Sequence, residues 1–372
     1  MSDHLTRPYK ILILGEAAAI HTRRWVAYFR KRGWTVRWLS FPPIDAGEGA
    51  EEIASQSGRR AWAIWRSRTC VRRVIDSFTP DIISALFLPD YGWLGCLTGR
   101  HPLAVSAWGS DVLLAPNKSP LHRWRIRYVL GNADWLFCDA EIIAARMREL
   151  GADPAKIQII PLGIEDTWFP PSPKHGDEAT IHVVTNRRLE PLYRVDTFLG
   201  AAAQLVSESP QRFRFTVVGD GSLRTELETQ ARELGLGESL TFTGFLPEPD
   251  LQRLMHAADI FVSCSSSDGT SVSLLEAMAA GAFPIVTDLP ANREWIQADE
   301  NGILFPVGDI DALARAIQRS ADDSVWRRRT REQNMTIVRG RALWQDNMAA
   351  AEETLITLIA DSRAQSARGS IR

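Results

Sequence analysis

Short apolar runs alternate with amphipathic stretches along the first half of the chain. The run KILIL at Lys10–Leu14 is typical of a buried parallel strand, and a helical pattern follows it over Thr22–Arg32 until Gly33 ends the helix. Further strands are predicted at Thr35–Leu39, Asp81–Ala85, Leu103–Ala107, Trp135–Cys138 and Ile157–Ile160. This alternation predicts an open parallel sheet that is covered by helices on both faces.

The same pattern starts again after residues 169–176, a stretch rich in proline and glycine that we interpret as a linker. Strands are predicted at Ile181–Val184, Phe213–Val218, Leu240–Phe242, Ile260–Val262 and Phe283–Val286. Helices are predicted at Val195–Val206, Ser222–Leu234, Asp250–Ala257, Val272–Ala280 and Ile310–Ala321. The chain is therefore expected to hold two doubly wound α/β domains, 1–168 and 177–341, with ligands bound in a cleft at the carboxyl ends of the strands.

Composition fits this two-domain picture and excludes several classes of protein. The chain has 372 residues, of which 45% are hydrophobic and 24% charged, and its net charge of −2 gives no overall attraction to nucleic acid. No apolar run approaches the roughly 18 residues of a membrane span, and the polar start shows no signal peptide. The four isolated cysteines suggest neither zinc nor disulfides. We therefore expect a soluble, cytoplasmic protein.

The most informative stretch is Ser265–Gly281, where a short strand leads through small residues into an apolar helix. The small residues Gly269–Ser271 allow a ligand to approach the backbone, and the free N–H groups at the helix start form an anion site. Glu276 is the only charge within that helix, and a buried carboxylate needs a partner such as a sugar hydroxyl. A core helix with structural caps explains the same spacing, so the pattern alone leaves both interpretations open.

Asp268 and Glu276, separated by seven residues within SSSDGTSVSLLEAMAAGAFPIVTD, resemble the Glu-x7-Glu motif of retaining glycosyltransferases of family 4. The segments IIPLGIEDTWFPP, VVGDGSLRTELETQARELGLGESLTFTGFLPEPDLQRLMHAADIFVSCS and NGILFPVGDIDALARAI extend the resemblance over nearly the whole chain. It implies a GT-B fold, in which two Rossmann-like domains face a cleft. A terminal helix at about 342–362 would then cross back to the first, acceptor-binding domain.

The resemblance also implies roles for individual residues. Asp268 would contact the hydroxyls of the donor sugar, Glu276 the ribose, and Arg188 the donor diphosphate. The other implied donor-binding positions are Gly219, Gly221, Phe245, Leu246, Gly269 and Thr270, joined at the helix start by Ser271 and Val272. Because negative charge develops on the leaving diphosphate, the cations and the amides of the helix start should lie there.

Three departures from the family pattern affect these roles. Tyr193 stands where the family usually has a lysine, and the neighbouring Arg194 is a candidate for the missing cation. Trp108 replaces a histidine that many members carry in the first domain. The loop after the first strand lacks the usual pair of glycines and leads to His21. The candidate catalytic residues are Asp268, Arg188, Asp111 and His21. Of these, Asp111 and His21 are candidates for orienting the acceptor.

No metal or resident cofactor is expected, and the nucleotide-diphosphate sugar serves as co-substrate. The sequence Asp309-Ile-Asp311 is interpreted as a helix N-cap with an acid in the first turn. Gly219-Asp-Gly221 follows a strand but has Arg224 at the third position of a dinucleotide fingerprint, which argues against NAD. The histidines have no metal-ligand spacing.

Six arginines lie within Arg59–Arg73 with no acid between them, and two tryptophans, Trp62 and Trp65, are interleaved. Such a helix suits an anionic membrane surface or a lipid diphosphate, although a solvated helix face has the same pattern. The predicted activity is metal-independent, hexosyltransferase-type transfer from a UDP- or GDP-sugar to a glycan or lipid-linked glycan in surface polysaccharide synthesis, at the inner face of the membrane. A non-catalytic sugar-nucleotide-binding protein and a sugar-nucleotide epimerase remain as alternatives.

Overall fold

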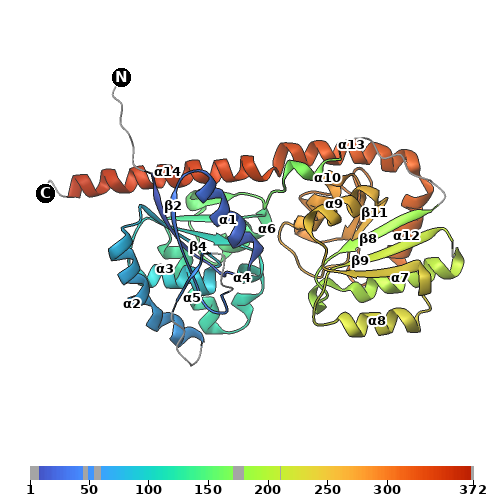
Figure 1. Cartoon of the computed structure of the whole chain (residues 1–372), viewed down its shortest axis with the longest axis horizontal. Coiled ribbons are helices and arrows are strands. Elements are labelled where there is room, and N and C mark those ends of the chain that lie inside the picture. Colours follow the sequence, from blue (N-terminus) through green and yellow to red (C-terminus); the bar gives the residue numbers. More distant parts are fainter. Residues whose placement is uncertain (1–7, 45–48, 54–59, 171–179, 210, 370–372) are drawn as a thin grey trace, which may run out of the picture. The chain divides into compact units, whose positions relative to one another are not determined.

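The computed structural model describes residues 8–44, 49–53, 60–170, 180–209 and 211–369 (Figure 1). The chain forms two compact units, each built around one parallel sheet with helices on both faces. The first unit comprises the residues up to Ile160 together with those from Met348 onwards, and the second comprises Pro161–Asn347. Two doubly wound α/β units confirm the fold class predicted from the alternating pattern.

The sheet of the first unit has the strand order β3-β2-β1-β4-β5-β6-β7. Its strands are β1 (Lys10–Leu14), β2 (Thr35–Ser40), β3 (Glu51–Glu52), β4 (Ile82–Leu86), β5 (Leu103–Ala107), β6 (Trp135–Cys138) and β7 (Ile157–Ile159). In the register of the sheet, Ile11 lies opposite Val36 on one side and Ile82 on the other. The order reverses between β1 and β4, which is where sheets of this kind bind ligands, at the carboxyl ends of the strands.

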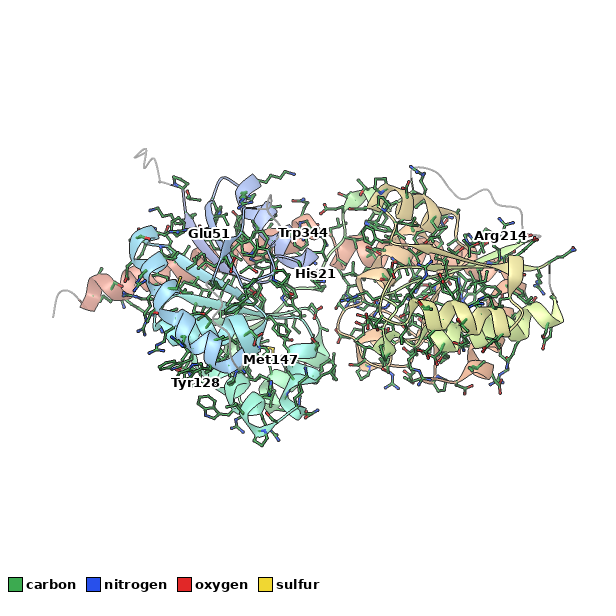
Figure 2. All side chains as sticks on the ribbon, turned by 60° about the horizontal axis from the view of Figure 1, so that its bottom comes forward. His21, Glu51, Tyr128, Met147, Arg214 and Trp344 are labelled. Atoms are coloured by element: carbon green, nitrogen blue, oxygen red, sulfur yellow. The ribbon has the colours of Figure 1, made fainter. Side chains whose placement is uncertain are left out.

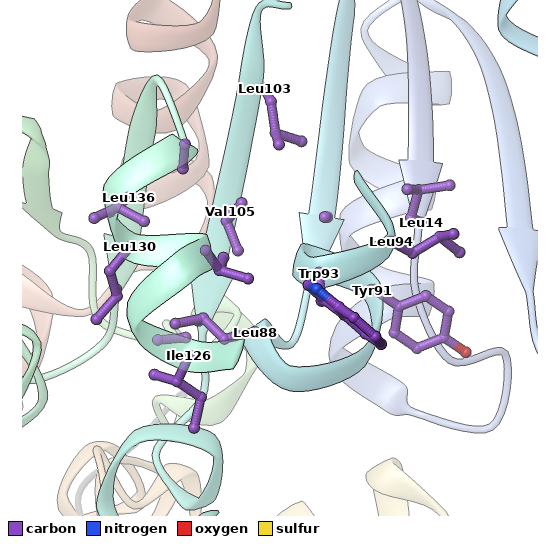
Figure 3. Close-up of a cluster of buried hydrophobic side chains, with 14 of the residues drawn as sticks. Leu14, Leu88, Tyr91, Trp93, Leu94, Leu103, Val105, Ile126, Leu130 and Leu136 are labelled. Carbon is purple, nitrogen blue, oxygen red and sulfur yellow. The ribbon is translucent and has the colours of Figure 1, made fainter. Parts of the chain in front are cut away.

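Helices cover both faces of this sheet. They are α1 (Ile20–Lys31), α2 (Arg60–Phe78), α3 (Trp93–Thr98), α4 (Ser110–Leu113), α5 (Pro120–Asn132), α6 (Glu141–Glu149) and α14 (Trp344–Gly369), with a π-helical turn at Leu88–Gly92. One face packs under α2, α3, α5 and α6, where Leu94, Val105 and Ile126 join one apolar core (Figure 3). On the other face Trp25 of α1 packs against Phe137 of β6.

The terminal helix α14 belongs to the first unit from Met348 onwards, which confirms the predicted return of the chain. Leu355 and Ile359 are buried along it. Its hydrogen bonds to the first unit include Thr354 Oγ1 to Gln158 Oε1 at 2.8 Å. The helix ends at Gly369, beyond the predicted end near residue 362.

The second unit repeats the architecture with the strand order β10-β9-β8-β11-β12-β13. The strands are β8 (Ile181–Asn186), β9 (Phe213–Val218), β10 (Leu240–Gly244), β11 (Ile260–Ser263), β12 (Phe283–Thr287) and β13 (Ile303–Phe305). The helices are α7 (Val195–Glu208), α8 (Arg224–Glu233), α9 (Glu248–Ala257), α10 (Val272–Ala280), α11 (Pro290–Arg293), α12 (Ile310–Asp322) and α13 (Ser324–Arg341). One core packs α7, α8 and α12 on the sheet, and a second core packs α9, α10 and α13 on its other face. The strand order reverses between β8 and β11.

The boundary between the units lies earlier in the chain than residue 168. Trp168 and Phe169 are buried in the core of the second unit, and Ile164 forms a β-bridge with Leu343 of that unit. These apolar contacts draw residues 161–169 into the second unit, so the first unit ends at Ile160. Most of the predicted linker, 169–176, lies outside the described residues, and Phe169 itself is a core residue. Within the described ranges no helix is long and apolar enough to cross a membrane.

Candidate active site

The loops after β8 and β11 lie beside each other at the point where the strand order of the second unit reverses. Both the backbone N–H and the hydroxyl of Ser266 donate to the carbonyl oxygen of Leu192, at 2.9 and 3.1 Å. The hydroxyl of Thr287 donates to the carbonyl oxygen of Ser265 at 2.7 Å. Hydrogen bonds within the protein thus hold the loop of Asp268 next to the loop of the arginines near residue 190.

Helix α10 begins directly after the small residues Gly269–Ser271, as the sequence predicts. Ser271 is its N-cap, and the Ser271 hydroxyl accepts a hydrogen bond from the N–H of Leu274 at 3.3 Å. Gly281 ends the helix in the left-handed conformation, with a φ of 84°. The helix spans the predicted Val272–Ala280. Its first N–H groups have no intrahelical partner and its dipole is positive at this end, so the helix start is suited to an anion.

Arg187, and not the sequence-predicted Arg188, is the buried arginine of this site. Its Nη1 donates to the Ser271 hydroxyl at 2.7 Å, and its Nη2 forms an ion pair with Asp268. The guanidinium also lies over the ring of Tyr193, 4.4 Å from the ring centroid. One arginine therefore connects the helix cap, the first acid of the motif and the aromatic residue that stands in the lysine position.

Asp268 is largely buried, and its environment acts on its pKa in two directions. Burial raises the pKa of this carboxyl above its ordinary value, whereas the charge and hydrogen bond of Arg187 lower it. Hydrogen bonds from the N–H of Gly269 and the hydroxyl of Ser265 also favour the ionised form. Without Arg187 the carboxylate would be an unpaired charge away from water.

The two arginines named from the sequence differ from this pattern. Arg188 exposes 74% of its side chain, and its Nη2 lies 3.9 Å from the Glu190 carboxylate. It is therefore a cation that can reach an approaching ligand. Arg194, suggested as the substitute for the missing lysine, pairs instead with Asp196 at 3.2 Å. Arg194 has a left-handed backbone with a φ of 47° and directly precedes α7, whose first turn carries Asp196.

Glu276 lies one turn inside α10, partly buried, with a polar partner from the neighbouring strand. Its Oε2 accepts a hydrogen bond from Asn186 Nδ2 at 3.2 Å. Asn186 is the last residue of β8, so this contact directs the carboxylate toward the carboxyl end of the sheet. The carboxylate thus has a protein partner and lies at the edge of the sheet where ligands bind in this fold, and both interpretations of the spacing fit this geometry.

Gly219 and Gly221 support the arginine loop through close backbone contact. A Cβ built on Gly219 would lie 2.2 Å from the carbonyl oxygen of Arg187, and one on Gly221 would lie 2.4 Å from that of Leu189. Gly219 also has a φ of 121°, which L-residues rarely adopt. Both glycines were named as donor-binding positions, and the structure shows that their lack of side chains brings β9 against residues 187–189.

The two apolar positions named for the nucleotide base differ in exposure. Phe245, after β10, is 81% exposed, whereas Leu246 packs partly buried against the core of the second unit. Phe245 thus presents an aromatic face to solvent, as base stacking requires.

In the first unit, His21 and Trp108 follow β1 and β5 at the carboxyl edge of the sheet. Their rings stack with centroids 5.8 Å apart, and Trp25 meets Trp108 edge-on at 6.4 Å. His21 lies in the first turn of α1 and is labelled in Figure 2. Burial and the charge of Arg24 lower the pKa of His21 to about 4, so its imidazole is neutral at physiological pH. This pair forms an aromatic surface at the edge of the sheet.

Asp111, named as a candidate for orienting the acceptor, is fully buried. Its carboxylate accepts hydrogen bonds from the N–H of Leu88 at 3.2 Å and from the N–H of Trp108 at 3.0 Å. Burial raises the pKa of Asp111 to about 6, and these hydrogen bonds oppose the rise. Asp111 therefore ties the loops after β4 and β5 together and supports Trp108, and its carboxylate does not reach the surface.

The Asp-x-Asp sequence of the second unit has the structural role predicted for it. Asp309 caps α12 and accepts from the N–H of Ala312 at 2.8 Å. Asp311 lies in the first turn and accepts from Gln204 Nε2 at 2.7 Å.

Comparison with known families agrees with this architecture in both units. Residues 165–336 match the family model "Glycosyl transferases group 1", and residues 10–140 match the model "Glycosyl transferase 4-like". The two matched regions fall on the two sheets.

Curated relatives are glycosyltransferases, and the names of some place them in polysaccharide biosynthesis. The amylovoran biosynthesis glycosyltransferase AmsK of Erwinia amylovora is 27% identical over 247 residues, which cover 63% of this chain and 60% of AmsK. The UDP-Gal:alpha-D-GlcNAc-diphosphoundecaprenol alpha-1,3-galactosyltransferase of Escherichia coli is 29% identical over 191 residues, or 48% of this chain and 49% of that enzyme. The chain thus spans half to three-fifths of the length of these two relatives.

Solved structures extend the likeness to the whole fold. Anabaena HepE, crystallised with UDP, has a TM-score of 0.79 at 19% identity over 94% of this chain and 100% of HepE. Sucrose-phosphate synthase of Thermosynechococcus elongatus has a TM-score of 0.79 at 20% identity over 95% of this chain and 100% of that enzyme. The fold is the GT-B fold. Together with the two family matches, it supports a glycosyltransferase.

Proposed function

We propose that this chain is a retaining, metal-independent glycosyltransferase of family 4 that transfers a hexose from a nucleoside diphosphate sugar. The observation that carries the proposal is the arrangement around α10. Asp268 precedes the open helix start and Glu276 lies one turn inside the helix, next to the carboxyl end of β8. Acids for hydroxyls and a positive helix end for phosphate are what a sugar nucleotide requires.

The transfer forms a bond between the anomeric carbon of the sugar and an acceptor oxygen, and breaks the bond from that carbon to the diphosphate. The electron pair leaves with the diphosphate, and the proton of the acceptor hydroxyl passes to its phosphate oxygen. The amides at Thr270–Val272 and the exposed Arg188 would stabilise the charge that develops there. Asp268 would orient the sugar through its hydroxyls, and Glu276 would bind the ribose.

The donor class is supported by the ligands of structural neighbours. HepE has been crystallised with UDP, with UDP and glucose, and with UDP-glucose. The Escherichia coli relative named above uses UDP-Gal according to its name. We propose a UDP- or GDP-sugar as the donor, with the base stacked near the exposed Phe245.

The acceptor side of the proposal rests on the first unit. The stacked rings of His21 and Trp108 offer an aromatic surface on which a sugar ring can pack, and a neutral imidazole can hydrogen-bond an acceptor hydroxyl. AmsK acts in amylovoran biosynthesis by its name, and the Escherichia coli relative takes a diphosphoundecaprenol-linked sugar by its name. We propose a glycan or lipid-linked glycan as the acceptor, met at the inner face of the membrane.

A membrane-facing surface is proposed on α2. Trp62 and Trp65 are 54% and 38% exposed and stack with ring centroids 4.9 Å apart, and the Arg68 guanidinium lies 3.6 Å from the centroid of the Trp65 ring. Exposed aromatic rings beside arginines suit the interface of an anionic bilayer. Arg72 takes no part, because it donates to the carbonyl oxygens of Thr98 and Leu97. Arg59 lies outside the described residues.

Helix α5 carries a second exposed aromatic surface in the same unit. Leu121 and Trp124 are 53% and 54% exposed, and the ring of Trp124 stacks on that of Tyr128 with centroids 5.6 Å apart. The exposed Arg123 and Arg127 lie on the same helix. Because α2 and α5 flank α3 on one face of the sheet, both surfaces belong to one side of the first unit.

The first experiment is thermal unfolding of the purified protein with excess UDP, GDP, ADP and NAD in parallel. A ligand at about 100 times its Kd adds about 2.7 kcal/mol to the unit that binds it, a shift of several degrees. We expect a shift with UDP or GDP and none with NAD.

The nucleotide that gives the shift then selects the donor sugars for a turnover assay with and without EDTA. Release of nucleoside diphosphate and an acceptor product of retained configuration would support the proposal. Binding without release would favour a binding protein, and an altered donor sugar without acceptor would favour an epimerase.

A further inference from the structure

Arg187 has more hydrogen-bond donors than its protein partners use. A guanidinium carries five N–H groups. Two of them are directed at Ser271 and Asp268, and Nε is buried with no partner among the described residues. The side chain is only 7% exposed, so only a small part of the guanidinium remains open to solvent or to a ligand. Buried donors without partners are costly, which indicates that an acceptor group belongs here.

The surroundings hold this guanidinium in one place. Tyr193 lies against its face at 4.4 Å, the Ser271 hydroxyl accepts from Nη1 at 2.7 Å, and Asp268 pairs with Nη2. Gly219 contributes as well, since the absence of its side chain leaves room for the backbone of residue 187. A cation fixed from three sides loses little conformational entropy when it binds a ligand.

The charges around Arg187 favour an oxyanion with several oxygens. Its Nη1 contacts the N-cap of α10, so a full positive charge and the positive helix end meet at one point. Asp268 is the one carboxylate paired with it among the described residues. The nearby Arg188 and Arg194 have carboxylates of their own at 3.9 and 3.2 Å. Planar guanidinium groups bind phosphate through two parallel N–H donors.

We propose that Arg187 is a phosphate-binding residue of the donor site, in which its free N–H groups bind the phosphate that carries the sugar while Asp268 and Tyr193 hold the guanidinium in place. This inference deepens the proposed function and rests on it for the identity of the ligand. Arg188 remains the exposed cation that meets the diphosphate from solvent.

The test compares variants by calorimetric titration with inorganic pyrophosphate, UDP, UMP and uridine. Arg187→Met removes the donors and keeps the side-chain length, and Arg187→Lys keeps the charge without the fork. Arg253→Met is the matched control, because Arg253 is an exposed arginine of the same unit paired with Asp250. Circular dichroism confirms that each variant is folded. If Arg187→Met does not fold, Tyr193→Ala removes the platform beneath the guanidinium instead.

We expect Arg187→Met to weaken pyrophosphate and UDP binding at least about tenfold, as expected for the loss of charge-assisted hydrogen bonds, and to leave uridine unchanged. The affinity for UMP, which lacks the sugar-linked phosphate, should fall less in this variant than the affinity for UDP. The affinities of Arg187→Lys should lie between those of the wild type and Arg187→Met. Equal pyrophosphate affinity in Arg187→Met and wild type, or no pyrophosphate binding by the wild type, would overturn the inference. Turnover of a nucleotide sugar is scored separately. If pyrophosphate binding depends on Arg187 but no donor releases nucleoside diphosphate, the proposed glycosyltransferase activity is refuted. The phosphate-binding role of Arg187 is then still supported.

Discussion

The indole Nε1 of Trp34 donates to Oε1 of Glu352 at 2.8 Å, although 318 residues separate them in the chain. The other carboxylate oxygen, Oε2, accepts from the Tyr28 hydroxyl at 3.0 Å and from Arg32 Nε at 2.8 Å. Glu352 is 6% exposed. A buried carboxylate of α14 thus receives three donors from the segment α1–β2, and burial together with Glu352 raises the pKa of Tyr28 to about 12.

Removing this carboxylate should loosen α14 from the first unit. Glu352→Ala leaves the donors of Trp34 and Tyr28 buried without an acceptor, and we expect a loss of roughly 3 kcal/mol. That corresponds to a fall in Tm of about 6–12 °C for a unit of this size, measurable by calorimetry. Glu353→Ala is the matched control, since Glu353 is exposed on the next position of the same helix. Equal Tm values for the two variants would contradict a stabilising role for Glu352.

The ribose role of Glu276 predicts a binding defect without loss of folding. Glu276→Ala should weaken UDP or GDP binding about tenfold, since a hydrogen bond to a charged acceptor is lost. The affinity for uridine or guanosine alone should fall by the same factor, because the lost contact is to the ribose and not to the phosphate. Calorimetric titration measures both, with Glu276→Gln as the variant that keeps an acceptor oxygen. Unchanged affinity in a folded Glu276→Ala protein would rule the role out.

Gly219 and Gly235 offer a paired test of close backbone approach. Both have a left-handed φ, 121° and 69°, but a Cβ on Gly219 would collide with the Arg187 carbonyl, whereas a Cβ on Gly235 meets nothing within 4 Å. Gly235→Ala should cost only the backbone strain, about 1 kcal/mol. Gly219→Ala should cost at least about twice that and should also weaken pyrophosphate binding by displacing residue 187. Similar denaturation midpoints for the two variants would argue against the contact.

Asp111 predicts a specific dependence of stability on pH. Its pKa is about 6 in the folded protein and near 3.9 when unfolded, so between these values the folded state binds the additional proton. Its contribution to stability is therefore complete below pH 4 and is lost as the pH rises through 6. Relative to wild type, Asp111→Asn should gain up to roughly 3 kcal/mol between pH 4 and pH 7. Denaturant unfolding across this range measures the difference, and parallel stability curves would contradict it.

The proposed membrane surface can be tested by sedimentation with vesicles. The wild type should bind vesicles rich in phosphatidylglycerol more than vesicles of phosphatidylcholine, and less at high salt, because arginine charges act with the exposed rings. The Trp62→Ala, Trp65→Ala double variant should lose most of this binding. Phe245→Ala, which removes an even more exposed aromatic ring from the second unit, should keep it. Equal binding to both kinds of vesicle would refute the proposed attraction between the arginines and anionic lipids.

Much of the fold follows from local patterns. Strands such as Lys10–Leu14 and Phe213–Val218 and the helix Val272–Ala280 coincide with the predicted ranges, because buried parallel strands and apolar helices have strong, local hydrophobic signals. The short strands β3 and β13 were missed, since Glu51–Glu52 has no apolar residue and Ile303–Phe305 is too short for a period. The unit boundary was placed too late because burial of Trp168 depends on distant residues.

For the site, the sequence by itself determined the small residues and the acid at the start of α10, because helix capping and the spacing of Asp268 and Glu276 are encoded within a few neighbouring residues. Only the tertiary structure decided which arginine of the pair Arg187–Arg188 is buried. That choice depends on Asp268, 81 residues away, and on contacts that no local pattern contains. In the same way, the resemblance to the family suggested that Asp111 orients the acceptor, whereas the packed structure buries its carboxylate between the loops after β4 and β5. Local propensity fixes the elements, whereas charge pairing across loops is a long-range property of the packed chain.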